Sequence, residues 1–364
     1  MSDNITAFFA FFFKNILTII HSTGNIQIKK DNTMEEVILK ITVEDVAIHA
    51  GVSRATAARI LGGYAGPRTK SREKVLSSAK KLGYLPNNFA KGLAKSKSNK
   101  IGIIIPDIEN LFFAKLYRGI ESICSKEGFS LLMGISGENK QKESTIVKEL
   151  LADQVEGIII ASANGLADIA NYPIPIVAVD RIPTDGKYSW VSTNNYETAY
   201  LAFNHLQQQG YKNISLITDF PYLSTIKERQ LGISDAAKDK RTNISTHITT
   251  SHQLEKMVQE IKNFIYRNKP EAVIVTDSVI CTAILIAVKE LGLQLGHDLG
   301  LLAYDDEPWM SLFTPSITTI EQPVVEMGEK AAQILLEQLF SSETIIRQER
   351  LLSQLIIRES TYRK

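Results

Sequence analysis

From residue 100 onward the chain alternates short apolar runs with stretches of helical periodicity, and this alternation most restricts how it can fold. The apolar runs lie at residues 101–105, 130–134, 157–161, 176–179, 214–218, 272–275 and 299–304. The helical stretches between them include residues 111–127, 141–153, 196–209 and 279–291. Strands that are apolar throughout and alternate with helices form parallel sheets covered on both faces. The pattern therefore predicts two doubly wound α/β lobes, with a ligand cleft at the carboxyl ends of their strands.

Residues 41–61, ITVEDVAIHAGVSRATAARIL, predict two short helices joined by a turn at Gly51. Thr42 and Ser53 stand at the expected helix caps, and Asp45 follows Thr42 by three residues as in a capping box. The outward positions of the second helix are Arg54, Ala55, Thr56 and Arg59. This is the layout of a helix-turn-helix, whose second helix reads base edges in the DNA major groove. An ordinary surface αα-hairpin is the alternative that the pattern alone leaves open.

The charge distribution favours DNA binding. Residues 51–100 contain twelve lysines or arginines and one acid, Glu73, whereas the whole chain has a net charge of only +1. A solvated surface would mix the two signs. A one-sided block beside a helix-turn-helix is typical of a phosphate-binding surface.

A third helix and a short polar segment follow the helix pair. The helix is expected from about Thr69 to Leu82, with an inner face formed by Val75, Leu76 and Ala79. The segment NNFAKGLAKSK, which begins at Asn87, could form only a very short helix. An isolated helix of that length is marginal in water. The segment is therefore either a flexible linker or a helix that forms only when DNA is present.

The bulk composition describes a soluble globular protein. At 364 residues the chain is long enough for two or three domains, and 44% of its residues are hydrophobic. Cys124 and Cys281 lie far apart and favour reduced, packed thiols in a cytoplasmic protein. No pair of histidines or cysteines has metal-ligand spacing, so the sequence predicts neither a metal site nor a cofactor.

The N-terminus is unusual. Residues 5–20, ITAFFAFFFKNILTII, are strongly apolar but are interrupted by Lys14. The run is shorter than the roughly 20 residues of a membrane span, and it lacks the basic start and cleavage site of a signal peptide. A membrane anchor is one interpretation. The favoured one is a start codon at Met34, just before the first helix, with no membrane partner.

Catalytic motifs are missing, whereas hydrogen-bonding side chains follow the expected strands. The sequence has no nucleophile elbow, phosphate-cradling glycine loop, nucleotide fingerprint or Ser/His/Asp set, so no enzyme is expected. The side chains at the strand ends are Asp107, Asn110, Asp180, Arg181, Asp277, Asp305 and Asp306. Carboxylates and guanidinium groups can each engage two hydroxyls of a polyol, and Phe112 and Phe113 offer flat faces for a sugar ring. Each carboxylate alone is more often a helix cap, but their recurrence predicts a polyol cleft.

Together these segments resemble the LacI/GalR family of bacterial transcription regulators. Residues 41–61 resemble its helix-turn-helix, and SREKVLSSAKKLGYLPNNFAKGLAKSKSNKIGIIIPDIENLFF resembles its third helix, hinge helix and first effector-domain strand. LGLLAYDDEPWMSLFTPSITTIEQP and QLIIRES resemble its late strand, crossover and C-terminal strand. The resemblance covers residues 41–364, which leaves residues 1–40 as an N-terminal extension outside it. It implies a DNA-binding domain (41–86), a hinge (87–99) and a two-lobed periplasmic-binding-protein-like core for effector binding and dimerisation (100–364). It also implies a homodimer, or a tetramer, that controls a catabolic operon.

The resemblance assigns DNA contacts residue by residue. Phosphate contacts fall on Thr42, Ser53 and Thr56, and the base-reading face consists of Arg54, Ala55 and Arg59. An arginine that bonds O6 and N7 of a guanine is worth about 1–3 kcal/mol of discrimination. Asn87 and Ala90 fall in the hinge helix, where Leu93 matches the leucine that wedges into the minor groove at the centre of a pseudo-palindromic operator.

The resemblance also assigns an effector site. Its residues are Asn110, Phe112, Phe113, Asp180, Arg181, Arg229, Asp305 and Gln322, in addition to Asp107 from the strand-end pattern. The chain departs from the family at Leu111, where the family has proline, and at Thr276-Asp277, where it often has Asn-Asp. The shorter hydroxyl of Thr276 would alter one sugar contact. Trp309 is either a lid over the ligand or a packed core residue.

The effector and the direction of control stay open. Lobe closure would part or join the hinge helices of the dimer, and a coupling of about 1–3 kcal/mol suffices for a switch. Induction by a sugar or a sugar acid is favoured over corepression, and Arg181 and Arg229 suit both ligands. A global regulator with a phosphoprotein partner is a further alternative. A transporter's solute-binding protein is disfavoured by the block at 41–97, and a sugar-modifying enzyme by the missing catalytic set.

Overall fold

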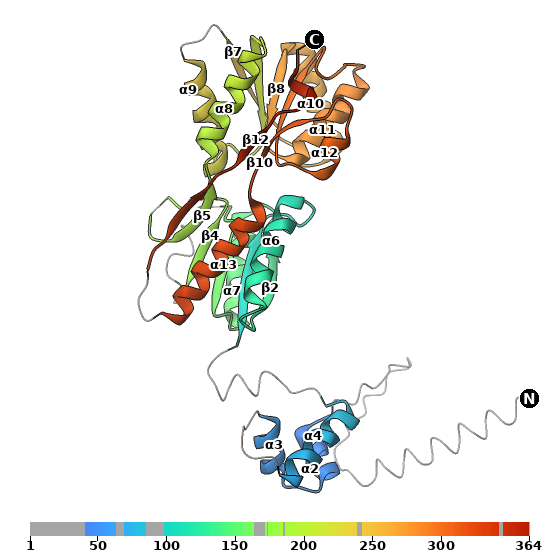
Figure 1. Cartoon of the computed structure of the whole chain (residues 1–364), viewed down its shortest axis with the longest axis vertical. Helices are drawn as coiled ribbons and strands as arrows, with labels where there is room; N and C mark the ends of the chain where they lie inside the picture. Colours follow the sequence, from blue (N-terminus) through green and yellow to red (C-terminus); the bar gives the residue numbers. More distant parts are fainter. Residues whose placement is uncertain are drawn as a thin grey trace, which may run out of the picture. The chain divides into compact units, whose positions relative to one another are not determined.

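The computed structural model describes residues 41–62, 69–84, 98–163, 172, 174–184, 186–238, 242–341 and 345–363. The expected extension at 1–40, with Met34, and the hinge residues Asn87, Ala90 and Leu93 lie outside these ranges. The chain divides into two compact units, residues 1–87 and 88–364 (Figure 1).

Among its described residues, the first unit has three helices around a small apolar core. The helices are α2 (Val43–Ala50), α3 (Arg54–Leu61) and α4 (Lys70–Leu82). One fully buried side chain from each helix meets in this core, namely Val46, Ala57 and Val75. The predicted helix pair and third helix are therefore present, with bounds close to those expected.

The predicted inner face of α4 is wrong at Leu76. This residue is 49% exposed, whereas Ser78 is buried and its hydroxyl lies 2.9 Å from Nδ1 of His49. Val75 and Ala79, one helical turn apart, set the face of α4 that packs against the other helices. Leu76 is rotated away from that face because successive residues of a helix point in different directions.

The second unit begins with a lobe built on a parallel sheet, called here the N-lobe. Its strand order is β11-β5-β4-β3-β1-β2. The strands are β1 (Lys100–Ile105), β2 (Ser130–Ile135), β3 (Gly157–Ile160), β4 (Ile176–Val179), β5 (Ser189–Thr193) and β11 (Gln348–Leu351). The helices of this lobe are α6 (Leu111–Cys124), α7 (Lys140–Ala152) and α13 (Val324–Phe340). Strands β3, β4 and β5 are buried along their whole length, as a parallel sheet covered on both faces requires.

The other lobe of this unit, called here the C-lobe, has the strand order β12-β10-β9-β8-β6-β7. The strands are β6 (Asn213–Thr218), β7 (Asn243–Ile248), β8 (Ala272–Val275), β9 (Gly300–Tyr304), β10 (Thr318–Glu321) and β12 (Gln354–Ile356). The helices are α8 (Asn195–Gln208), α9 (Ser224–Ala237), α10 (Leu254–Asn268), α11 (Ser278–Glu290), α12 (Pro308–Leu312) and the 3-10 turn η1 (Glu359–Thr361). The doubly wound fold class is thus confirmed, except that β12 pairs antiparallel with β10.

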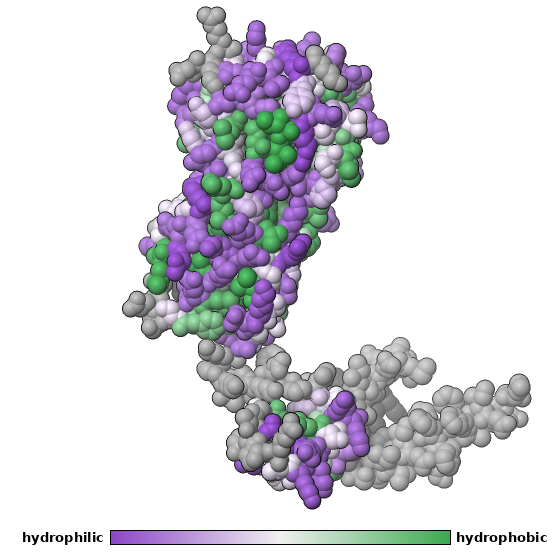
Figure 2. Space-filling model, viewed as in Figure 1, coloured by the Kyte–Doolittle hydropathy of each residue, from purple (hydrophilic) through white to green (hydrophobic). Residues whose placement is uncertain are grey.

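Several strands were not predicted, and two of them, β7 and β11, lie at sheet edges. Both alternate exposed residues with partly buried ones. An edge strand pairs on one side only and does not need the continuous apolar run of a central strand. The face of the two lobes seen in Figure 2 is mostly polar with apolar patches. Among the described residues, no helix combines the length and apolar character that crossing a bilayer would need.

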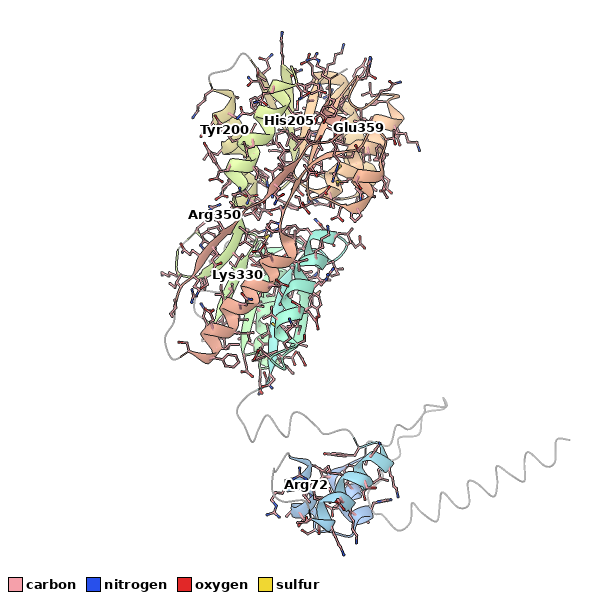
Figure 3. All side chains as sticks on the ribbon, viewed as in Figure 1. Arg72, Tyr200, His205, Lys330, Arg350 and Glu359 are labelled. Carbon is pink, nitrogen blue, oxygen red and sulfur yellow. The ribbon has the colours of Figure 1, made fainter. Side chains whose placement is uncertain are left out.

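The chain passes between the lobes after β5, after β10 and after β11. Contacts between the lobes accompany these crossovers. Arg350 of β11 (Figure 3) makes a bidentate ion pair with Glu228 of α9 at 2.8 and 2.5 Å. On α6, Lys115 Nζ lies 3.1 Å from the nearly fully buried Glu307 of the C-lobe. These pairs link surfaces that would separate if the lobes opened.

Candidate functional site

The two short helices of the first unit begin at side-chain caps. The Thr42 hydroxyl accepts a hydrogen bond from Asp45 N at 3.3 Å, and Asp45 Oδ2 accepts from Thr42 N at 2.7 Å. Ser53 Oγ accepts from Thr56 N at 3.2 Å, and the two hydroxyls lie 2.8 Å apart. Gly51 has φ 65°, which permits the left-handed turn between the helices. The helix-turn-helix is therefore fixed by local chemistry that the sequence already contains.

The outer face of α3 presents the three side chains expected to read bases. Arg54, Ala55 and Arg59 are all exposed, whereas Ala57 between them is fully buried. Arg54 Nε lies 3.3 Å from Glu44 Oε2, but both side chains are more than half exposed. An exposed ion pair of this kind contributes about 0–1 kcal/mol. Arg54 can therefore exchange this partner for another acceptor at little cost.

The two lobes of the second unit enclose a cavity of about 420 Å³ at the carboxyl ends of their strands. Eleven of the twelve side chains expected at an effector site line it. They are Asp107, Asn110, Phe112, Phe113, Asp180, Arg181, Arg229, Thr276, Asp277, Asp305 and Gln322. Because the carboxyl ends of parallel strands meet at one edge of a sheet, the fold brings together residues that lie up to 215 positions apart in the chain.

Trp309 is the side chain that does not belong to this group. It packs against the apolar core of the C-lobe and lines a separate cavity with Leu285 and Phe313. Of the two interpretations made from sequence, the packed one describes its position. The reason is local: α12 begins at Pro308 and directs Met310 into the core, and Trp309 covers the neighbouring surface of α11.

The N-lobe wall begins at the turn between β1 and α6. Asp107 Oδ1 accepts a hydrogen bond from Glu109 N at 2.9 Å, and Asn110 caps α6 by accepting from Phe112 N at 3.0 Å. Phe112 and Phe113 are buried and meet edge to face, with ring centroids 5.1 Å apart. The turn therefore holds a flat apolar surface beside polar side chains.

Asp180 and Arg181 follow β4 and are both buried. Asp180 has φ 67°, and this strained backbone is held by hydrogen bonds with Val191 and Ser192 of β5. Arg181 makes a bidentate ion pair with Glu138, a residue that was not predicted. Burial opposes the charge on Arg181, but Glu138 outweighs it and raises the pKa of Arg181.

Arg229 of α9 forms the corresponding cationic group of the C-lobe. Its Nε donates to Asn195 Oδ1 at 2.8 Å and its Nη1 donates to the carbonyl of Thr276 at 2.6 Å. The guanidinium carbon lies 3.8 Å from the ring centroid of Tyr304. These contacts fix the guanidinium plane of a side chain that is only 4% exposed.

A chain of hydrogen bonds joins the cavity to two crossovers. Gln322, which follows β10, donates through Nε2 to Asp305 Oδ1 at 2.7 Å. Its Oε1 accepts from the hydroxyl of Thr193, at the end of β5, at 2.9 Å. A ligand that contacts Asp305 would therefore act directly on the segments that connect the lobes.

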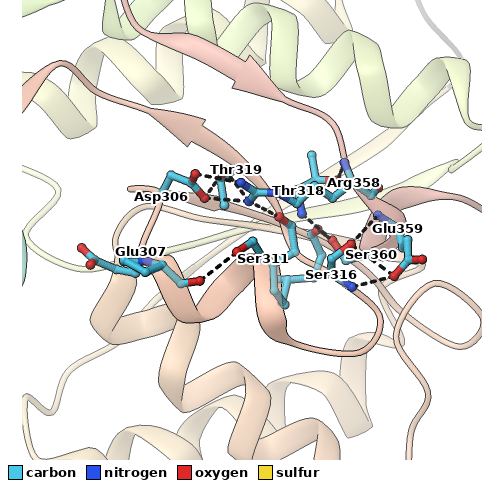
Figure 4. Close-up of polar contacts among 12 residues, drawn as sticks. Asp306, Glu307, Ser311, Ser316, Thr318, Thr319, Arg358, Glu359 and Ser360 are labelled. Carbon is cyan, nitrogen blue, oxygen red and sulfur yellow. Dashed lines mark hydrogen bonds and ion pairs between the residues drawn. The ribbon is translucent and has the colours of Figure 1, made fainter.

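Asp306, the residue after Asp305, is held by hydrogen bonds from β10 and from the C-terminal segment. Arg358 donates to both carboxylate oxygens of Asp306 at 2.6 and 2.8 Å, and Thr319 donates to the same carboxylate (Figure 4). These hydrogen bonds outweigh burial and lower the pKa of Asp306. Asp305 itself has φ 67° and lines the cavity. Of these two consecutive aspartates, Asp305 therefore faces the cavity, whereas Asp306 binds Arg358 and stabilises the fold.

Three carboxyl groups of the C-lobe wall hold protons more tightly than usual. Burial, together with the nearby charge of Glu138, raises the pKa of Asp219 to about 6. Burial and the charge of Asp219 raise the pKa of Asp277 to about 7, and burial raises that of Asp305 to about 7. These carboxyl groups therefore keep their protons to a higher pH than an exposed aspartate does.

Sequence reasoning missed Glu138, Asp219 and Asn195. Asp219 comes directly after β6, so the rule that selected the other strand-end residues could have found it. Glu138 stands in the turn before α7, and Asn195 begins α8. Neither has a motif of its own, because each acts as the partner of a buried arginine from a distant part of the chain.

A helix-turn-helix with exposed arginines, followed by a two-lobed α/β core around a polar cavity, defines a DNA-binding regulator with a ligand-binding core. Residues 42–87 match the protein-family model described as "Bacterial regulatory proteins, lacI family". Residues 203–361 match the model described as "Periplasmic binding protein-like domain". The ribose operon repressor of Bacillus subtilis (strain 168) is 32% identical over 300 residues, which cover 81% of this chain and 90% of that protein. The chain belongs to the lacI family of bacterial regulatory proteins.

One further related protein and one solved structure are consistent with membership of the lacI family. The catabolite control protein A of Priestia megaterium is 27% identical over 321 residues, 84% of this chain and 95% of that protein. The crystal structure of a LacI family transcriptional regulator from Enterococcus faecium, with bound ribose, superposes with a TM-score of 0.66 and 25% identity. It covers 73% of this chain and 99% of the Enterococcus protein.

Proposed function

We propose that this regulator is a homodimeric repressor of a carbohydrate-utilisation operon and that a polyol bound between the lobes releases it from DNA. The observation that carries the proposal is the cavity of the second unit, where eleven expected polyol-binding side chains converge. A volume of about 420 Å³ lies in the range of small-molecule sites. The names of the ribose operon repressor and of the ribose-bound Enterococcus structure support the same ligand class.

On the DNA side, α3 is the reading element. Arg54 and Arg59 are exposed on its surface and can each reach a guanine edge, whereas Ala55 offers only a methyl group. Thr42, Ser53 and Thr56 stand at the starts of α2 and α3, where hydroxyls and helix N-termini suit phosphate oxygens. The hinge residues Asn87, Ala90 and Leu93 would complete the contact in the minor groove.

On the effector side, each lobe supplies part of the ligand's surroundings. Asp180 and Arg181 come from the N-lobe, and Arg229, Asp277 and Asp305 come from the C-lobe. Carboxylate and guanidinium groups suit adjacent hydroxyls, and the rings of Phe112 and Phe113 suit the C–H face of a sugar. A ligand bound to both walls favours the closed arrangement of the lobes, and closure is the step that would be transmitted to the hinges.

We assign the contact between the two subunits of the homodimer to the surface of α11 and α12. A second copy of this chain would bind there. An apolar cavity of about 1050 Å³ lies there, lined by Leu285 and Phe313, and the adjacent Leu312 is 83% exposed. Lys289 and Glu359 line the same cavity and could pair across a two-fold axis. Sedimentation velocity should find a dimer that Phe313→Glu converts to monomers. A Phe313→Glu protein that stays dimeric would place the contact elsewhere.

The decisive experiment is a DNA-binding titration of the full chain on an inverted-repeat duplex selected from a random library. Binding should weaken as salt rises, and a neutral sugar from a panel should weaken it further. Arg229→Ala and Arg229→Lys should keep the DNA affinity and lose the response to sugar. If no inverted repeat is preferred, the DNA assignment is wrong.

The same titration separates induction from corepression. A sugar that tightens DNA binding would identify a corepressor-dependent member of the family. A requirement for a cell extract, removed by protease treatment of that extract, would identify a global regulator with a protein partner, as the likeness to catabolite control protein A allows.

A further inference from the structure

The charges that line the cavity are strongly one-sided. Among the described residues, its carboxylates are Asp107, Glu138, Asp180, Asp219, Asp277 and Asp305, whereas its guanidinium groups are Arg181 and Arg229. A sugar acid needs a cationic group that is free to receive its carboxylate. The question is therefore whether either arginine has donors left for a ligand.

Arg181 is already occupied by protein acceptors. Both of its terminal nitrogens donate to the carboxylate of Glu138, and Nη1 also lies 3.3 Å from the carbonyl of Ala161 and 3.1 Å from that of Ser162. Its Nε makes no hydrogen bond to any residue that the structure describes, but this atom is buried, 3.6 Å from Asp180 Oδ2, and so offers a ligand no open donor. A ligand carboxylate could use Arg181 in the bidentate manner only by displacing Glu138, which would leave that carboxylate without its partner.

Arg229 offers one nitrogen rather than two. Its Nε and Nη1 are engaged by Asn195 and Thr276, and Tyr304 lies against the guanidinium plane. Within the described part of the chain, Nη2 makes no hydrogen bond. A hydroxyl oxygen can accept from Nη2 alone, whereas a carboxylate held by two parallel hydrogen bonds would have to share Nη1 with the carbonyl of Thr276.

Two carboxylates of the C-lobe wall add repulsion toward an anionic ligand. Asp219 and Asp277 have no cationic group within 4.0 Å among the described residues, and burial together with the charge of Asp219 raises the pKa of Asp277. A ligand anion would add a further negative charge to a buried group of carboxylates. A ligand hydroxyl, in contrast, can donate hydrogen bonds to them.

We propose that the effector is a polyol without a carboxylate or phosphate group, and that Glu138 enforces this selectivity by occupying Arg181. This inference rests on the proposed function, because it concerns the ligand of the same cavity. The sequence alone favoured neither a neutral sugar nor a sugar acid as the effector. This inference selects the neutral sugar.

The test is isothermal titration of the full chain at pH 8 with matched ligands. The probes are D-glucose, D-galactose and D-ribose, each compared with its carboxylate (D-glucuronate, D-galacturonate, D-ribonate) and its terminal phosphate ester. At least one neutral sugar should bind, and its carboxylate and phosphate forms should bind at least about tenfold more weakly. In Glu138→Gln, which frees the donors of Arg181, this ratio should shrink at least about tenfold.

The matched control is Glu349→Gln. Glu349 belongs to β11 of the same lobe, and its carboxylate lies 3.5 Å from Lys330, outside the cavity. It should leave the ratio unchanged, although the charge of the protein changes equally. Glu138→Ala serves as a second variant if Glu138→Gln is poorly folded.

Opposite results overturn the proposal in distinguishable ways. A wild-type protein that binds an acid as tightly as its neutral partner refutes the selectivity, and an unchanged ratio in both Glu138 variants refutes the role of Glu138. In both cases a polyol still binds and the proposed function survives. If no probe binds or alters operator affinity, the proposed function fails and this inference fails with it.

Discussion

Replacing Asp305 by Asn is expected to stabilise the second unit against unfolding at pH 8. Burial raises the pKa of Asp305 to about 7 from its ordinary 3.8, despite the attraction of Arg229. Asn keeps the oxygen that accepts the 2.7 Å hydrogen bond from Gln322 but removes the charge. Because one pH unit corresponds to about 1.4 kcal/mol, the gain in the free energy of unfolding reaches about 4 kcal/mol at most.

The gain has a definite dependence on pH. Below about pH 4 the Asp305 carboxyl is protonated in both the folded and the unfolded chain, so variant and wild type should be equally stable. Between about pH 4 and 7 the unfolded chain ionises while the folded chain keeps the proton, so the wild type loses stability as pH rises. From pH 5 to pH 8 the advantage of Asp305→Asn should therefore grow by about 2–3 kcal/mol.

Urea denaturation followed by tryptophan fluorescence measures this advantage. The two tryptophans, Trp190 and Trp309, lie in different lobes of the second unit, so both lobes are reported. Asp306→Asn is the matched control, because it breaks the ion pair with Arg358 and should cost about 1–3 kcal/mol. The pKa of Asp306 is lowered, so its contribution is lost only below its ordinary 3.8 and the cost should stay constant from pH 5 to pH 8. An Asp305→Asn advantage that does not grow with pH would refute the reasoning.

Three further predictions follow from the packing and contacts. Arg59→Ala should abolish discrimination between operator and random duplex while leaving sugar affinity unchanged; preserved selectivity in a competition titration would remove Arg59 from the base-reading face. Gly328→Ala should destabilise the N-lobe by about 3 kcal/mol or more, because the new Cβ would collide with the carbonyl oxygen of Leu116 on α6; an unchanged urea midpoint would contradict this. Lys115→Met should break the ion pair with buried Glu307 and weaken sugar binding about tenfold through the closed state; unchanged affinity by titration calorimetry would show that closure does not depend on this pair.

The sequence predicted the elements whose physics is local. Helices α2 and α3 begin at Thr42 and Ser53 because those hydroxyls cap them, and such caps can be read directly from the chain. Central strands such as β1 and β4 were found because burial on both faces requires continuous apolar runs. Edge strands such as β7 and β11 have no such requirement and were missed.

The candidate site divides in a similar way. Asp305 could be predicted because its position follows from a rule about where parallel strands end. Glu138 could not, because its role comes from Arg181, 43 positions later in the chain, and from the fold that brings the two together. A buried arginine after a strand does imply an acidic partner, since an unpaired charge inside a protein is costly. The sequence therefore shows that Arg181 needs a carboxylate, but only the folded chain shows whether a protein residue or the ligand supplies it, and that difference decides which effector the cavity accepts.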